Sequence, residues 1–194
     1  LDFEDHLEDI RNKIFTAFGA QVSASAAMAT KSVNKANYEG EILTNVVLND
    51  NGSVKETRHI EIGTDDDIHY EPGDSIGIIL LDDEGKKISP RLYSIASSVN
   101  ETEGEVHLTV SVLKYIDEDG KEQKGLCSNY LASLKEGDKV SFYVSKNRQF
   151  KLPAEDKDII MVGPGTGIAP FRAFMAERNF QNSSGKSWLF FGEC

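Results

Sequence analysis

Residues 91–98 (RLYSIASS) combine the apolar residues of a strand with an arginine, a tyrosine and three serines. A guanidinium group binds a phosphate or pyrophosphate through paired, charge-assisted hydrogen bonds. A tyrosine ring can stack on a flat heterocycle while its hydroxyl keeps a polar partner. Side chains two residues apart on a strand share a face, so Arg91 and Tyr93 are expected side by side. The pattern indicates a site for a dinucleotide with a flat redox ring, although an edge strand with a solvated Arg and Tyr would look the same.

A second candidate phosphate-binding element lies at residues 125–128 (GLCS), just before the sequence NYLASL. Ser128 is expected to cap a short helix over 129–134 and to leave the first helical amides facing outward. A helix start with a glycine before it suits a phosphate. On spacing alone, an ordinary capped helix is the favoured interpretation of the same residues.

The third motif occupies residues 158–191. The run 158–162, apolar after Asp158, predicts a strand, and the glycine-rich turn 163–167 leads into a helix over 168–180 and a further strand at 188–191. This order is the opening βαβ unit of a nucleotide-binding fold, although the turn lacks the strict G-x-G-x-x-G spacing. Pro170 falls in the first helical turn, where its missing N–H group costs little.

These three ordered motifs resemble those of the ferredoxin–NADP reductase superfamily over residues 38–194. The resemblance implies that Arg91 holds the pyrophosphate of FAD and that Tyr93 stacks on the isoalloxazine ring. It also implies that Ser94 hydrogen-bonds near the ring nitrogen that accepts a hydride, so Ser94 is the catalytic candidate. The cofactor-binding residues implied in this way are Arg91, Leu92, Tyr93, Ser94, Thr109, Val110, Ser111, Tyr115, Gly125, Leu126, Cys127, Ser128, Gly165 and Thr166.

Within that set, the resemblance divides the residues among parts of the cofactors. Residues 109–111 match the strand that forms the flavin wall, and Tyr115 matches an aromatic residue near the adenosine half. Residues 125–128 match the helix start that meets the FAD pyrophosphate, and Thr166 matches an NADP contact. No metal ligand is implied.

The expected fold class is mainly β, an antiparallel FAD-binding β-barrel followed by the start of an α/β NADP-binding domain. Several short apolar or alternating runs separated by turn residues predict the barrel. The expected strands are 41–48, 58–62, 75–81, the strand that begins at Arg91, 105–115 and 139–145. The expected domains are a helix at 1–18, a linker at 19–37, the barrel at 38–153 and the βαβ part at 154–194.

Apolar residues near the N-terminus recur at spacings of three or four, which predicts an amphipathic helix. They are Phe3, Leu7, Ile10, Ile14 and Phe18. The helix either packs on the following domain or is the last helix of a preceding FMN-binding domain. Both ends look cut, so we expect a piece of a longer protein. A helix, a flexible linker and a flavin module together resemble the layout of the diflavin reductases.

Among these, residues 90–98 and 150–153 (FKLP) are most similar to the flavoprotein subunits of NADPH-dependent sulfite reductases. The implied activity is an NADPH-dependent reductase in which FAD accepts a hydride and passes electrons singly to an FMN domain or a hemoprotein partner. The chain differs from the diflavin reductases in two respects. The charged turn 82–87 replaces the long connecting domain of diflavin reductases, and the family's NADP 2′-phosphate residues would lie beyond Cys194. A ferredoxin– or flavodoxin–NADP reductase, or a non-catalytic FAD-binding module, therefore remains an alternative.

The composition restricts the partners. The net charge of −11 and a pI of about 4.8 argue against nucleic acid or an anionic membrane as the main partner. The two cysteines, Cys127 and Cys194, are too few for a disulfide framework, which favours a reducing compartment such as the cytoplasm. No apolar run approaches membrane-spanning length, so no membrane partner is expected.

Overall fold

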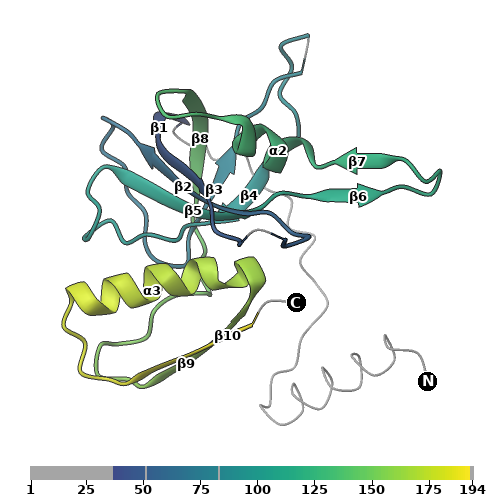
Figure 1. The fold of residues 1–194 in the computed structure, drawn as a ribbon. Coiled ribbons are helices and arrows are strands. Elements are labelled where there is room, and N and C mark those ends of the chain that lie inside the picture. The colour runs from purple at the N-terminus through teal and green to yellow at the C-terminus, as the bar shows by residue number, and fades with distance from the viewer. Residues whose placement is uncertain (1–36, 51, 83, 193–194) are drawn as a thin grey trace, which may run out of the picture. The chain divides into compact units, whose positions relative to one another are not determined.

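The computed structural model describes residues 37–50, 52–82 and 84–192 (Figure 1). They belong to one compact unit that covers residues 35–194. The expected N-terminal helix (1–18) and nearly all of the expected linker lie outside the described residues.

A six-stranded antiparallel sheet forms most of this unit, with strand order β4-β3-β8-β1-β2-β5 (Figure 1). The mainly β prediction is therefore confirmed. β1 carries an irregularity between Ile42 and Thr44, where its register against β2 shifts. The strands are β1 (Asn37–Val47), β2 (Thr57–Gly63), β3 (Ser75–Ile78), β4 (Arg91–Ser94), β5 (Glu105–Ser111) and β8 (Lys139–Ser145).

The two end strands of the sheet, β4 and β5, approach each other without forming a continuous ladder in the described residues. An isolated antiparallel bridge joins Ile95 to Leu108, and the Ala96 amide donates to the His107 carbonyl over 2.8 Å. The predicted barrel is therefore an open sheet in the described residues, and its two edge strands are joined by a single bridge.

Alternating residues of the strands build the core, as the sequence predicts. Each of these side chains contributes on the order of 1.5–3 kcal/mol through burial. Those exposed by no more than 1% include Ile60, Ile62, Ile76, Ile78, Val106, Leu108, Val110, Val140 and Phe142.

The predicted strand 105–115 is divided in two, because Val112 and Leu113 leave the ladder for other partners. The Val112 amide donates to the Glu56 carbonyl and the Leu113 amide donates to the Ser128 hydroxyl. The chain then forms a hairpin of β6 (Lys114–Ile116) and β7 (Glu122–Lys124), followed by helix α2 (Leu126–Ser133).

The C-terminal part of the unit has the predicted βαβ order. β9 (Ile159–Pro164) leads through a 3₁₀ turn, η1 (Gly165–Ile168), into α3 (Ala169–Phe180), and β10 (Ser187–Gly192) pairs parallel with β9. Pro170 lies in the first turn of α3, as predicted. Among the described residues, no helix is long and apolar enough to cross a membrane.

Helix α3 also packs against residues outside the βαβ unit. The rings of Phe171 and Phe174 lie 5.8 and 5.0 Å from the ring of Phe150, measured between centroids. This aromatic cluster attaches α3 to the segment that follows β8.

Candidate functional site

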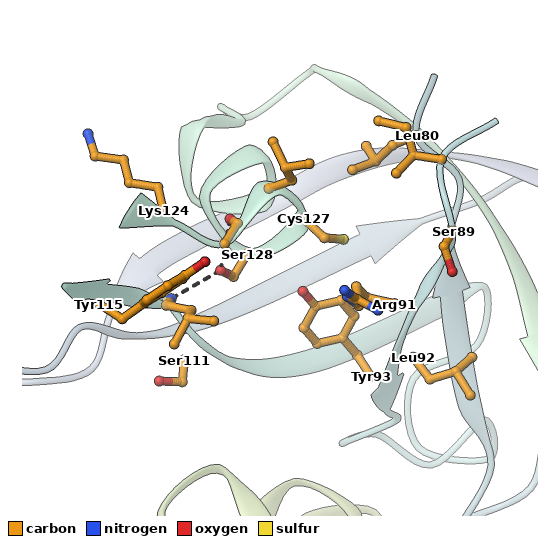
Figure 2. Close-up of a pocket in the computed structure, with 14 residues that line it drawn as sticks. Leu80, Ser89, Arg91, Leu92, Tyr93, Ser111, Tyr115, Lys124, Cys127 and Ser128 are labelled. Atoms are coloured by element: carbon orange, nitrogen blue, oxygen red, sulfur yellow. Dashed lines mark hydrogen bonds between the residues drawn. The ribbon is translucent and has the colours of Figure 1, made fainter. Parts of the chain in front are cut away.

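A cavity of about 500 Å³ opens between β4, the β6–β7 hairpin and the start of α2 (Figure 2). This volume lies in the range typical of small-molecule and cofactor sites. Its lining residues are Leu80, Ile88, Ser89, Arg91, Leu92, Tyr93, Ser111, Leu113, Tyr115, Lys124, Gly125, Leu126, Cys127 and Ser128.

Arg91 and Tyr93 both line this cavity, as their spacing predicts. β4 pairs antiparallel with β3, with Arg91 opposite Ile78 and Tyr93 opposite Ile76. Arg91 is exposed to solvent, whereas the Tyr93 ring is half-buried. Burial raises the pKa of Tyr93 and a hydrogen bond to Cys127 raises it further, so the hydroxyl stays protonated at neutral pH.

The start of helix α2 forms the opposite wall (Figure 2). The helix begins at Leu126, and no side chain caps it. The backbone N–H groups of its first turn have no acceptor within the helix, so they are available to bind a ligand. An uncapped helix start that faces a cavity can receive a phosphate.

The predicted role of Ser128 as the helix cap was wrong. Ser128 lies inside the helix, and its hydroxyl accepts from the Leu113 amide (3.0 Å) and lies 3.3 Å from the Gly125 carbonyl. The Asn129 amide group donates to the carbonyls of Leu113 and Gly125 over 2.9 and 2.8 Å. These bonds hold the helix start against the connection between β5 and β6.

The charge of the cavity differs from that of the chain. Its lining includes the cations Arg91 and Lys124 and no carboxylate, although the chain carries a net charge of −11. Two cations, an uncapped helix start and a tyrosine ring in the lining of one cavity fit a ligand that joins an anionic group to an aromatic ring system. FAD meets these requirements.

Nine of the predicted cofactor residues therefore share one cavity, and five lie elsewhere. Ser94 is partly buried on β4, opposite Ser75. The Thr109 hydroxyl accepts from Arg172 over 2.9 Å, and the Val110 side chain is fully buried in the core. The other two, Gly165 and Thr166, belong to η1.

The glycine-rich turn before α3 is tightly packed. A Cβ atom at Gly163 would lie 2.9 Å from the Ile168 Cα and 3.0 Å from the Gly167 carbonyl oxygen. Gly165 has a positive φ of 53°, a conformation that glycine adopts at little cost. The turn thus needs glycine at positions 163 and 165 for its geometry, and its predicted contact with NADP stays a prediction.

Five lining residues were absent from the sequence-based set: Leu80, Ile88, Ser89, Leu113 and Lys124. Four of them lie within three residues of a predicted site residue, and the fifth, Leu80, accepts a 2.9 Å hydrogen bond from the amide of Ile88. Nothing in their types distinguishes them from ordinary surface or core residues, so only the tertiary arrangement identifies them.

Comparison with known proteins agrees with this geometry. The chain matches the family model for the FAD binding domain over residues 80–130 and the model for the oxidoreductase NAD-binding domain over residues 161–193. All the residues that line the cavity fall in the first segment, and α3 and most of β9 and β10 fall in the second.

Curated relatives are similar over the same part of the chain. The sulfite reductase [NADPH] flavoprotein alpha-component of Vibrio vulnificus is 54% identical over 110 residues, or 56% of this chain and 18% of that protein. The corresponding protein of Aliivibrio fischeri is 50% identical over 109 residues, again 56% of this chain and 18% of the relative. The matched part of the chain thus spans less than a fifth of the length of these relatives.

A solved structure of ferredoxin-NADP+ reductase from Plasmodium falciparum is similar in fold, with a TM-score of 0.68 and 25% identity. The similarity covers 81% of this chain and 58% of that one. Together these comparisons confirm the resemblance to the ferredoxin–NADP reductase superfamily, and within it to sulfite reductase flavoproteins.

Proposed function

We propose that this chain is the FAD-binding part, with the first βαβ unit of the NADP-binding part, of an NADPH-dependent flavoprotein reductase of the sulfite reductase type. The observation that carries this proposal is the cavity beside β4. All of its lining residues lie in the segment that matches the FAD-binding model, and they combine cations, an uncapped helix start and a tyrosine ring.

In this proposal, each wall of the cavity binds a different part of the cofactor. Arg91 and the amides at the start of α2 bind the pyrophosphate, and the Tyr93 ring stacks on the isoalloxazine. Tyr115, on the β6–β7 hairpin, contacts the adenosine half. When bound, FAD supplies a two-electron acceptor that can release its electrons one at a time.

The βαβ part is proposed to bring NADPH to the same site. The turn at Gly165 and Thr166 receives the NADPH pyrophosphate through backbone amides at the beginning of α3. Ser94, partly buried at the end of β4, orients the hydride-accepting region by a hydrogen bond. The contacts between α3 and the six-stranded sheet fix the distance between the two nucleotide sites, on which hydride transfer depends strongly.

The proposed partners are NADPH as the reductant and an FMN domain or a hemoprotein as the electron acceptor, with sulfite reduction as the final use of the electrons. The proposal is supported by the names of the relatives, which specify NADPH, a flavoprotein and sulfite reductase. The FMN domain is expected in another part of the complete protein.

Identification of the bound flavin tests whether the chain binds FAD. The purified chain is loaded with a mixture of FAD and FMN, washed and heated, and the released flavin is identified by chromatography. We expect FAD, because two phosphate-binding elements suit a pyrophosphate. Recovery of FMN alone, or of no flavin, would contradict the proposal.

Reduction of the bound FAD by NADPH is tested in the complete protein by stopped-flow absorbance. Fast bleaching of the flavin absorbance is expected, and its absence in a protein that retains FAD would favour a non-catalytic FAD-binding module.

A ferredoxin– or flavodoxin–NADP reductase is the second candidate, favoured by the short connection between β3 and β4. Leu81 pairs with Lys87 across a tight turn, and the Asp82 amide donates to the Lys86 carbonyl over 2.9 Å. No connecting domain is inserted there. Comparing electron transfer to a ferredoxin, a flavodoxin and an FMN domain in the complete protein separates the two candidates.

A further inference from the structure

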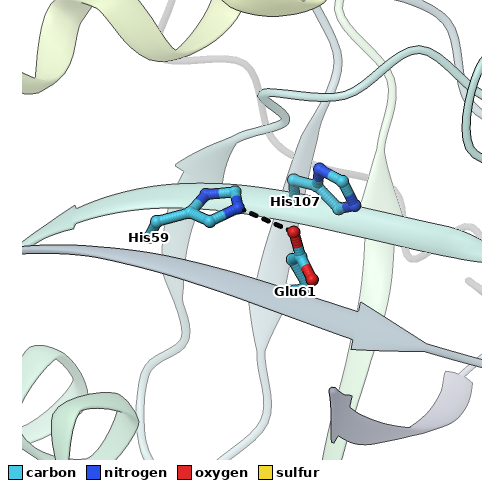
Figure 3. A group of neighbouring side chains, drawn as sticks. All are labelled: His59, Glu61 and His107. Carbon is cyan, nitrogen blue, oxygen red and sulfur yellow. Dashed lines mark hydrogen bonds and ion pairs between the residues drawn. The ribbon is translucent and has the colours of Figure 1, made fainter. Parts of the chain in front are cut away.

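Three potential metal ligands lie together on adjacent strands of the sheet (Figure 3). His59 and Glu61 are two residues apart on β2 and so share a face. The antiparallel register with β5 places His107 directly opposite Glu61. One ligand atom from each of the three residues lies within 4.8 Å of the other two.

The three side chains are ordered by their own contacts. The His59 Nε2 atom lies 2.9 Å from the Glu61 carboxylate, and the His107 Nε2 atom lies 2.8 Å from the Glu105 carboxylate. The two imidazole rings meet edge to face, with centroids 5.4 Å apart. The side chains of His59, Glu61 and His107 are 15%, 27% and 13% exposed, so solvent reaches the group while packing restricts it.

This group is separate from the proposed cofactor cavity, because none of its members lines that cavity. Nothing in the proposed reductase function uses two histidines and a carboxylate at this position.

We propose that His59, Glu61 and His107 form a binding site for a divalent transition metal of the Zn²⁺ or Co²⁺ type. Two imidazoles and one carboxylate are ligands that these ions prefer. Metal–ligand bonds of about 2.0–2.2 Å separate tetrahedral ligands by roughly 3.3–3.6 Å, so small side-chain rotations close the present spacing. Glu105 hydrogen-bonds to His107 Nε2 over 2.8 Å but does not belong to the three-residue group, so a water molecule would take the fourth position.

The hydrogen bond between Arg172 and His59 competes with binding of the metal ion. Its Nη1 atom lies 3.2 Å from the His59 Nδ1 atom and 2.9 Å from the Thr109 hydroxyl. A guanidinium group only donates hydrogen bonds, so His59 Nδ1 accepts and the imidazole proton sits on Nε2, towards Glu61.

Coordination through His59 Nε2 requires this proton to leave that nitrogen. The neutral ring then carries its proton on Nδ1, where it faces the N–H groups of Arg172 and can no longer accept from them. The positive charge of the ion adds repulsion. Metal binding therefore releases Arg172 from His59, and because Arg172 belongs to α3, the ion removes one contact between α3 and the sheet.

Titration calorimetry with ZnCl₂ on the chelator-treated chain tests the site. One Zn²⁺ per chain is expected, with affinity at least about tenfold weaker in His107→Asn and in Glu61→Gln. The matched control is His69→Asn, since His69 is 75% exposed beside Asp67 and forms a surface histidine–carboxylate pair outside the group. Circular dichroism verifies that each variant is folded. No binding, or binding that His107→Asn leaves unchanged, would overturn the proposal.

Replacing Arg172 gives an independent test, because it predicts a gain of affinity. Arg172→Leu removes the competing donor and its charge, so Zn²⁺ should bind at least about tenfold more tightly. Unchanged or weaker binding would overturn the proposed competition. Co²⁺ absorption checks the ligand types: tetrahedral d–d bands without a thiolate charge-transfer band are expected, and a thiolate band would assign the ion to a cysteine instead.

Discussion

The carboxylate of Glu177, on α3, accepts a 2.5 Å hydrogen bond from the hydroxyl of Ser98, in the segment that follows β4. The same carboxylate accepts from the side-chain amides of Asn100 (2.9 and 3.0 Å) and Gln181 (2.6 Å). Glu177 is only 5% exposed. A buried carboxylate surrounded by donors thus attaches the βαβ part to the segment beside the proposed flavin site.

The first prediction concerns this attachment. Glu177→Gln preserves the shape but turns an N–H group towards the donors of Ser98 and Asn100. It should lower the free energy of unfolding by about 1–3 kcal/mol in urea denaturation. Glu118→Gln, at an exposed turn position, should change it by no more than about 0.5 kcal/mol. Equal effects of the two variants would show that the Glu177 contacts contribute nothing.

The second prediction compares two glycines with similar positive φ angles. Gly73 (φ 95°) lies so close to Phe150 that a Cβ atom would be 1.9 Å from the Phe150 carbonyl oxygen. A Cβ atom on Gly52 (φ 102°) would meet no atom of the described residues within 4 Å, apart from those of its chain neighbours. Gly52→Ala should cost about 1–2 kcal/mol of stability from backbone strain alone. Gly73→Ala adds a backbone clash and should cost at least about 3 kcal/mol.

Urea denaturation of both variants measures this difference. Similar losses in the two would mean that the turn at Gly73 can move away from Phe150 freely.

The strands and their buried faces could be predicted from the sequence because alternation is a local signal. Ile60 and Ile62 on β2, and Val106 and Leu108 on β5, are buried as their spacing indicates. The same rule placed Arg91 and Tyr93 on one face, and both line the cavity.

Predictions that depend on tertiary partners were less successful. Ser128 looks like a helix cap from its neighbours, but its hydroxyl binds the amide of Leu113, fifteen residues earlier. The resemblance assigns Val110 to the flavin wall with its two neighbours, but successive residues on a strand face opposite sides and the Val110 side chain is in the core. Only its backbone could therefore contribute to that wall, and the assignment stays a prediction. His59 and His107 carry no local sequence signal of a shared site, because only the register between β2 and β5 brings them together.

The third prediction concerns Arg91. Losing a charge-assisted contact to phosphate should weaken FAD binding by about 1.5–3 kcal/mol, or roughly 10–100-fold, in Arg91→Ala. Arg91→Lys should recover only part, because an ammonium group cannot present a planar fork. Fluorescence titration with FAD measures both. Arg148→Ala, an exposed arginine outside the cavity lining, is the control and should bind FAD normally.

If Arg91→Lys binds FAD as tightly as the unchanged chain, the paired hydrogen bonds proposed for Arg91 do not exist.

The fourth prediction separates chemistry from binding at Ser94. If its hydroxyl acts near the hydride-accepting nitrogen, Ser94→Ala in the complete protein should slow flavin reduction by NADPH about 100-fold and leave the FAD content near normal. Stopped-flow absorbance and the flavin-to-protein ratio give the two readings. Loss of FAD with an unchanged rate per bound flavin would make Ser94 a binding residue only.

The last prediction uses Cys127, which is buried and lines the cavity. Burial raises the pKa of its thiol, and the hydrogen bond to Tyr93 and the charge of Arg91 only partly offset this. Alkylation requires the thiolate, whose ordinary pKa is about 8.5. Between pH 7 and 9, iodoacetamide should therefore modify Cys127 more slowly in the folded chain than in urea. The difference should narrow as the pH rises through the raised pKa.

Bound FAD should protect this thiol further, because the cofactor would cover the wall on which it lies. We expect alkylation of Cys127, followed by mass spectrometry of its peptide, to slow at least about tenfold at saturating FAD. Riboflavin, which lacks the pyrophosphate, should protect much less at the same concentration, and Arg91→Ala should reduce the protection by FAD. If FAD leaves the alkylation rate of Cys127 unchanged, the cofactor binds outside this cavity, whatever its affinity.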